Sequence, residues 1–192
     1  RLRTVTGVQT CALPIFISHG HADHLGGLQD FLGVNQRAIV LLSKHAPNRK
    51  LYSARETLRP IGTTCDLSTI AHRLLYIEDE PLIVDNFIAT PVKTKKYDVP
   101  KANKMLFMET ANGLQQDDFN HEIVVAAGKN DWFVYTGCAH GGLLNMLDTV
   151  ECLSSKPISV VAGGFHLPDE RESKFETPDD LKRLAEMLSN KY

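Results

Sequence analysis

Residues 19–24 place four side chains that commonly bind metal ions within six positions of the sequence: His19, His21, Asp23 and His24. Imidazole nitrogens and carboxylate oxygens suit borderline divalent ions such as zinc. In an extended segment His19 and His21 project to the same side, whereas a turn that starts at Asp23 and His24 can aim these two side chains at a neighbouring position. The spacing therefore predicts a site for two adjacent metal ions.

The alternative interpretation of this cluster is a histidine-rich surface turn. Gly26 and Gly27 argue against it, because glycines at this point would let the backbone pack closely behind the ligands, which a surface turn would not require. A β-like run at residues 16–17 precedes the cluster, and apolar residues at helical spacing follow over residues 25–31. We therefore expect the histidines to lie in a turn between a strand and a helix.

Two later histidines lie at the ends of expected buried strands, where α/β folds often place ligand-binding groups. His140 follows a strand expected at residues 132–136 and precedes a helix, and His166 follows a strand expected at residues 158–162. His166 could bind metal or donate a hydrogen bond to substrate. For each histidine the alternative is a structural role, with its hydrogen bonds satisfied inside the protein.

Two further side chains are weaker candidates for the site. Cys138 could reach a metal as a thiolate, but cysteine is often a small buried hydrophobic residue. His121 precedes an expected strand at residues 122–127 and could line a pocket, with a solvated loop histidine as the equal alternative. The lysine-rich residues 93–104 read as a loop, either simply solvated or placed to meet a phosphate group.

The remaining pattern predicts short strands in the middle of the chain with flanking helices, hence a layered α/β sandwich. The 192 residues fit one domain. Further strands are expected at residues 37–42, 74–77, 87–90 and 105–108, with a hairpin turn at 128–131. Helices are expected from residue 143 to 152 and over residues 181–188, the latter capped by Thr177.

The run SHGHADHLGG at residues 18–27 is similar to the signature of the metallo-β-lactamase superfamily. The resemblance implies an αββα sandwich in which His19 and His21 bind a first metal ion and Asp23 and His24 a second. It implies two divalent ions, zinc first, with iron or manganese as alternatives. The flavodiiron branch has a glutamate where this chain has His21, so the resemblance favours hydrolysis over oxygen reduction.

Residues 135–142 and 161–167 narrow the resemblance to one subgroup. Together they resemble the dihydropteroate-synthase-like proteins, also described as 7,8-dihydropterin-6-methyl-4-(beta-D-ribofuranosyl)aminobenzene 5'-phosphate synthase-like. This resemblance implies that His140 is a further metal ligand. It also leads us to expect a domain truncated at both ends, without its first strands and without a ligand segment after the last helix.

Residues 5–15 resemble the translation of a sequencing adapter. We therefore expect residues 1–15 to be an artefactual segment and residues 16–192 to be the partial metallo-β-lactamase-fold domain.

The function that these patterns predict is metal-dependent hydrolysis of an ester, amide or phosphate-type bond. Two adjacent ions would activate water near neutral pH, and Asp23 would orient or relay the proton of the nucleophile. The substrate is expected to be a small molecule, with pterin or ribosyl-phosphate compounds suggested by the subgroup alone. The alternative is a non-catalytic metal- or ligand-binding protein on the same scaffold.

Composition disfavours several other classes of protein. A formal net charge of -2 gives no bias toward nucleic acid or anionic membranes, and no apolar run is long enough to cross a bilayer. The four cysteines form no C-x-x-C pair, which favours reduced thiols over a disulfide framework. These features predict a cytoplasmic protein without nucleic-acid or membrane partners.

Overall fold

The computed structural model of the chain describes residues 14–64, 66–167 and 175–191. Most of the adapter-like segment, residues 5–13, lies outside the described residues. Its last residue, Ile15, pairs with Val40 in a parallel ladder. Among the described residues, no helix is both long and apolar enough to span a membrane.

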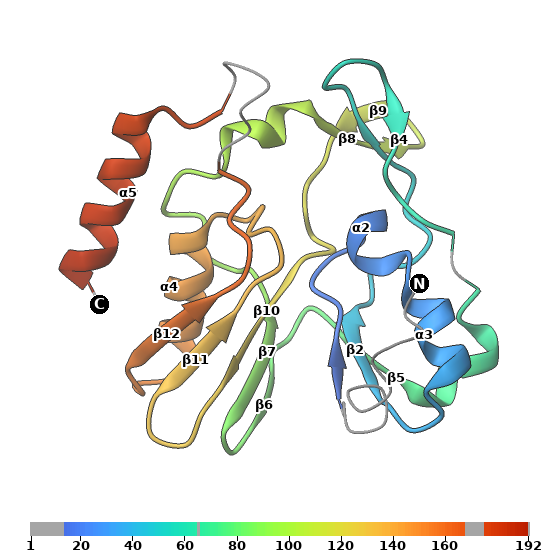
Figure 1. Cartoon of the computed structure of the whole chain (residues 1–192), viewed down its shortest axis with the longest axis horizontal. Coiled ribbons are helices and arrows are strands. Elements are labelled where there is room, and N and C mark those ends of the chain that lie inside the picture. The colour runs from blue at the N-terminus through green and yellow to red at the C-terminus, as the bar shows by residue number, and fades with distance from the viewer. Residues whose placement is uncertain (1–13, 65, 168–174, 192) are drawn as a thin grey trace.

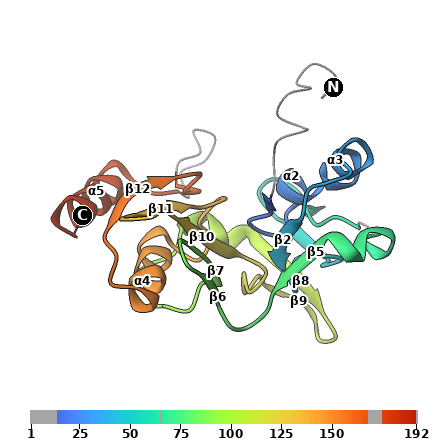
Figure 2. The ribbon, with the colours of Figure 1, turned by 90° about the horizontal axis from the view of Figure 1, so that it is seen from below.

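The N-terminal layer is a parallel three-stranded sheet covered by two short helices (Figures 1 and 2). Its strands, in spatial order, are β1 (Ile15–Phe16), β2 (Val40–Ser43) and β5 (Leu74–Ile77). The helices are α2 (Ala22–Leu25) and α3 (Leu28–Val34). The helices pack on the sheet through one buried apolar cluster, which contains Leu25, Leu28 and Leu32 of the helices with Val40 and Leu42 of β2.

The single helix expected over residues 25–31 is wrong, because the chain divides it at Gly26 and Gly27. Gly26 caps α2 by donating its N–H to the carbonyl of Ala22, and Gly27 is the N-cap of α3 with φ −85° and ψ −2°. Glycine has a low helix propensity and no side chain to pack, so this pair is where the helix breaks most easily. The histidine segment nevertheless lies between a strand and a helix, as expected.

The second layer is a five-stranded sheet with one long helix against it (Figure 2). Its spatial order is β12 (Ile158–Ala162), β11 (Trp132–Tyr135), β10 (Ile123–Ala127), β7 (Phe87–Pro91) and β6 (Leu82–Val84). All neighbouring pairs are antiparallel except β11 with β12. Helix α4 (Leu143–Leu153) buries Met146, Leu147 and Val150 against Trp132 and Val134 of β11.

A third apolar cluster joins the two sheets. Leu41 of β2 and Ile77 of β5 lie in it with Ala89 of β7 and Ile123 and Val125 of β10. Strand β10 therefore has one face against α4 and the other toward the three-stranded sheet, which explains its continuous apolar sequence. The chain is thus an α/β protein with helices on the outer side of each of two sheets.

A smaller four-stranded sheet, two 3-10 helices and a last α-helix complete the described fold (Figure 1). The strands are β4 (Arg59–Pro60), β3 (Leu51–Ser53), β8 (Leu106–Thr110) and β9 (Gly113–Gln116), and the 3-10 helices are η1 (Ser68–Arg73) and η2 (Lys101–Met105). The last helix, α5 (Pro178–Lys191), begins as the sequence predicted, with the Thr177 hydroxyl accepting the N–H of Asp180 at 3.2 Å.

Candidate metal centre

Three histidines from two distant loops meet where the sheets come together. His19 and His21 follow β1, and His140 lies between β11 and α4. Their ring centroids are 4.6 Å (His19–His21), 5.0 Å (His19–His140) and 4.8 Å (His21–His140) apart. All three residues are buried, and each offers a ligand atom within 4.8 Å of the others. The two histidine segments that the sequence singled out thus form one cluster.

The three imidazoles fit a shared metal ion. Nε2 of His19 lies 3.1 Å from Nδ1 of His21. Two nitrogens bound tetrahedrally to zinc at about 2.0–2.1 Å are roughly 3.3 Å apart, so these two atoms are already near that separation. Nε2 of His140 is buried and has no hydrogen-bond partner among the described residues. Because buried polar atoms are rarely left unpaired, this nitrogen points to a missing ligand.

Asn103 determines which nitrogen His140 presents. Its Nδ2 donates to the His140 carbonyl at 2.7 Å, which turns its Oδ1 toward Nδ1 of His140 at 3.0 Å. An amide oxygen only accepts hydrogen bonds, so His140 carries its proton on Nδ1 and keeps a lone pair on Nε2. Glu122 holds the same loop, accepting the N–H groups of His140 at 3.0 Å and Gly141 at 2.7 Å.

A second group of possible ligands adjoins the first. Sγ of Cys138 lies 3.3 Å from Nε2 of His24, and these two residues form a candidate group with His19. The Ser18 hydroxyl is 3.0 Å from Nδ1 of His19 and 3.2 Å from Nδ1 of His24. A hydroxyl oxygen that accepts from both ring N–H groups would leave both Nε2 atoms for metal.

Asp23 is less well placed than the sequence suggested. Its side chain is 73% exposed, and its carboxylate lies 3.6 Å from Nε2 of His24. None of the ligand groups found among the described residues includes it. The structure brings Asp23 to the rim of the cluster and leaves its carboxylate facing solvent.

Gly137 allows the two loops to approach each other. A Cβ at this position would lie 2.0 Å from Oγ and 2.4 Å from Cβ of Ser18, and 3.1 Å from Nδ1 of His19. No side chain fits in that space, so a glycine is required where the loop after β11 crosses the loop after β1.

His121 also lies beside the cluster, but its ring is held on both sides. Nδ1 accepts the N–H of Gly20 at 3.0 Å, and Nε2 is 3.1 Å from Oδ2 of Asp117. Both His121 and Asp117 are buried. Because both of its ring nitrogens have partners, His121 has a structural role in this conformation. The sequence had left open that it lines a pocket.

His166 contacts the cluster from the segment that follows β12. Its ring centroid is 4.3 Å from that of His140, and it forms a candidate ligand group with His140 and Cys138. Its Nε2 lies 3.3 Å from Nη2 of Arg55. The φ of +52° at His166 is unusual for a residue other than glycine, and such conformations concentrate at functional sites.

Burial keeps the imidazoles of His19, His140 and His24 neutral. Desolvation, and then the neighbouring His21, holds the pKa of His19 well below its ordinary value. Desolvation likewise lowers the pKa of His140, with a further contribution from His166, and that of His24. Neutral imidazole is the form that binds metal, so the site is prepared for coordination near pH 7.

The acidic groups of the site respond differently to burial. Desolvation raises the pKa of Glu122 to about 7, although the two backbone N–H groups oppose it. Desolvation also raises the pKa of the Cys138 thiol to about 12. For Asp117, burial favours the protonated form, but the contacts with His121 and His21 outweigh it and the pKa lies below its ordinary value. A metal ion would deprotonate Cys138 directly.

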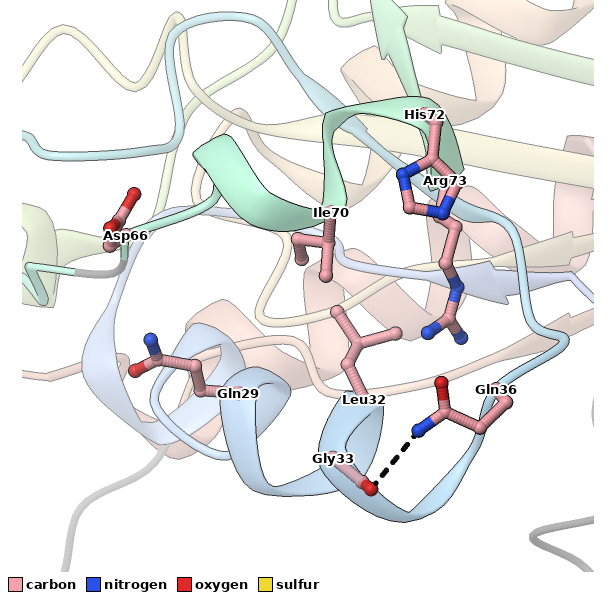
Figure 3. Close-up of a pocket in the computed structure, with 8 residues that line it drawn as sticks. All are labelled: Gln29, Leu32, Gly33, Gln36, Asp66, Ile70, His72 and Arg73. Atoms are coloured by element: carbon pink, nitrogen blue, oxygen red, sulfur yellow. Dashed lines mark hydrogen bonds between the residues drawn. The ribbon is translucent and has the colours of Figure 1, made fainter.

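Two other features formed by the described residues, the lysine-rich segment and a surface pocket, contain none of the candidate metal ligands. Lys96 pairs with Asp148 at 2.8 Å, and Lys101 pairs with Asp180, so part of the lysine-rich segment makes surface ion pairs. A pocket of about 370 Å³ between α3 and η1 contains none of the expected site residues (Figure 3). Arg73 at its edge donates to the carbonyls of Ala38 and Asn35, which is a structural role.

Sequence reasoning missed four residues that form hydrogen bonds with the histidines of the site or with their backbone: Ser18, Asn103, Asp117 and Glu122. Asn103 and Asp117 lie in polar segments that resemble solvated loops, and no local spacing connects them with the histidines. The only available signal was Glu122 directly after His121, at the start of a strongly apolar strand.

No protein-family model and no curated protein matches the sequence of this chain. Among solved structures, the chain matches the crystal structure of Tm1679, a metal-dependent hydrolase of the beta-lactamase superfamily, with a TM-score of 0.70 and 25% sequence identity. The match covers 91% of this chain and 63% of the Tm1679 chain, so this chain spans less than two thirds of that protein's length. The chain is therefore similar in fold to a metal-dependent hydrolase.

Proposed function

We propose that the chain belongs to a metal-dependent hydrolase of the metallo-β-lactamase superfamily, with an αββα sandwich as its scaffold. The observation that carries the proposal is the buried meeting of His19, His21 and His140, with Nε2 of His140 lacking a partner among the described residues. Three buried imidazoles make a poor structural core unless something binds their lone pairs. The similarity to Tm1679 supports the same interpretation.

In this proposal the chain holds two divalent ions, with zinc as the first choice. His19, His21 and His140 hold one ion, and His24 with Cys138 contributes to the second, to which Asp23 would add its carboxylate. When bound, the ions supply Lewis acidity that activates water and stabilises charge on the substrate. A thiolate ligand favours zinc over manganese, because soft ligands disfavour hard ions.

The protein's own residues would then prepare the site. Asn103 and Glu122 fix the loop that carries His140, so little reorganisation is needed for that ligand. In the hydrolase, Asp23 would orient or relay the proton of the nucleophile, as the sequence suggested. His166, which adjoins His140 and Cys138, would contact the substrate or an ion. We propose a small-molecule ester, amide or phosphate-type substrate, with pterin or ribosyl-phosphate compounds as first choices on the resemblance alone.

The test is the metal content of the purified chain, measured by elemental mass spectrometry. We expect about two zinc equivalents per chain. His140→Ala should lose at least one, whereas His45→Ala should keep both. His45 is in none of the ligand groups found among the described residues and lies 3.6 Å from Asp79. Failure of the unaltered chain to bind zinc, manganese or iron would refute the proposal.

The second candidate is a metal-binding protein without turnover. The exposed carboxylate of Asp23 favours it, because a proton-relaying group normally faces the reacting atoms. Assays of zinc-loaded protein on phosphoesters, lactones and amides decide between the two. Hydrolysis that is lost in His140→Ala supports the enzyme, and stoichiometric metal without hydrolysis of any substrate supports the binding protein.

A further inference from the structure

Asp117 lies behind the metal-ligand cluster and reaches two histidines with one oxygen. Its Oδ2 is 3.1 Å from Nε2 of His121 and 3.6 Å from Nε2 of His21, and its side chain has 0% exposure. Its Oδ1 accepts the N–H of Phe119 at 3.0 Å and lies 3.9 Å from the nearest nitrogen of Arg49. Burying a carboxylate is costly unless its partners are fixed, so its position beside a ligand needs explanation.

The hydrogen bonds of His121 exclude it as a metal ligand in this conformation. The N–H of Gly20 donates to Nδ1, so that nitrogen must keep its lone pair. A neutral His121 therefore carries its proton on Nε2 and donates it to Asp117 at 3.1 Å. Although His121, Asp117 and His21 are close enough to surround an ion, a protonated Nε2 cannot coordinate it.

His21 needs a hydrogen-bond acceptor for its Nε2. Its Nδ1 faces Nε2 of His19 inside the ligand cluster, whereas its Nε2 points toward Asp117 and has no hydrogen-bond partner among the described residues. An imidazole that binds metal through Nδ1 carries its proton on Nε2, and that proton requires an acceptor. The 3.6 Å separation from Asp117 exceeds a hydrogen bond by roughly 0.5 Å, which a small ring rotation would close.

We propose that Asp117 is a positioning residue, which fixes the proton of His21 on Nε2 and so presents Nδ1 to the metal. His121 joins Asp117 to the N–H of Gly20, the residue between the two ligands His19 and His21. One carboxylate thereby orients a ligand ring and, through His121, the backbone that carries it. The inference rests on the proposed metal site and adds a residue that supports it without binding the ion.

The test compares Asp117→Asn with Asp118→Asn in the 192-residue chain. Asp118 is a matched control, because it is the adjacent acid and also contacts Arg49, at 2.9 Å, but its side chain is 41% exposed. Zinc affinity is measured by competition with a chromophoric chelator, and zinc stoichiometry by elemental analysis. Asp117→Asn should keep the stoichiometry and lose about 10- to 100-fold in affinity, whereas Asp118→Asn should change little.

A second measurement reads the proton positions directly and needs no variant. Long-range ¹⁵N–¹H correlation spectra of the zinc-loaded protein report which ring nitrogen carries the proton in each histidine. We expect protons on Nε2 of both His21 and His121. A proton on Nδ1 of His21, or a metal-bound Nε2 of His121, would overturn the inference even if Asp117→Asn fails to fold.

The outcomes separate this inference from the proposed function. Loss of a whole zinc equivalent in Asp117→Asn would make Asp117 a ligand and overturn the positioning role. Equal zinc affinities of Asp117→Asn and Asp118→Asn would also overturn the positioning role. In both cases the three-histidine site stands. If the unaltered chain binds no metal, the proposed function fails and this inference fails with it.

Discussion

Replacing Gly137 with alanine tests the close contact between the two metal-binding loops. The new Cβ would lie 2.4 Å from Cβ of Ser18, and rotating the serine hydroxyl cannot relieve that clash. Ordinary carbon contacts begin near 3.5 Å, so the loops must separate by roughly 1 Å. Overpacking of this kind costs about 1–3 kcal/mol of unfolding free energy.

The same separation should weaken metal binding. Ser18 holds His19 and His24 through its hydroxyl, and Cys138 lies directly after Gly137, so a shift of the loops displaces ligands of both groups. We expect zinc affinity to fall by roughly 10- to 100-fold, as for loss of a residue that orients a ligand. Urea unfolding of the metal-free protein and zinc competition measure the two effects separately.

Gly33→Ala is the matched control. Gly33 lies inside α3, and a Cβ there meets no atom within 4 Å. Alanine should therefore stabilise the protein by about 0.5–1 kcal/mol through helix propensity and leave zinc affinity unchanged. If Gly137→Ala matches the original protein in both unfolding midpoint and zinc affinity, the close contact between the loops is refuted.

Three further predictions concern the Cys138 thiol, the buried histidines and the packing of α4. Cobalt(II)-loaded protein should show thiolate charge-transfer absorption in the near ultraviolet that disappears in Cys138→Ser; its absence from the original protein would remove Cys138 as a ligand. Because His19 and His140 have folded-state pKa values below the unfolded value of about 6.5, the unfolded chain binds more protons. The stability they contribute should be complete above pH 6.5 and lost as the pH falls, so a urea midpoint of the metal-free protein that is unchanged between pH 7.5 and 5.5 would contradict their burial as neutral rings. Leu147→Ala, at a side chain with 0% exposure beneath the five-stranded sheet, should cost about 2–5 kcal/mol in urea unfolding, and a cost under about 1 kcal/mol would contradict the packing of α4.

Local sequence patterns determined most of the elements around the site. The apolar runs at residues 74–77 and 158–162 are strands with those bounds, and the helix expected from residue 143 is α4. Such runs can be read locally because period and apolar content reflect burial of the element itself. The helix expected over residues 25–31 failed because a glycine pair outweighed three apolar residues at helical spacing.

The candidate ligands could also be identified from the sequence, because the spacing of His19, His21 and His24 within one turn indicates a metal site. Only the tertiary structure decided how each is used. It buried His19, His21 and His140 together, left Asp23 at the exposed rim, and placed Asn103 and Asp117 behind the rings. The physical reason is that a polar residue in a loop looks the same in sequence whether water or a buried imidazole will be its partner, and that choice is made only when distant segments pack.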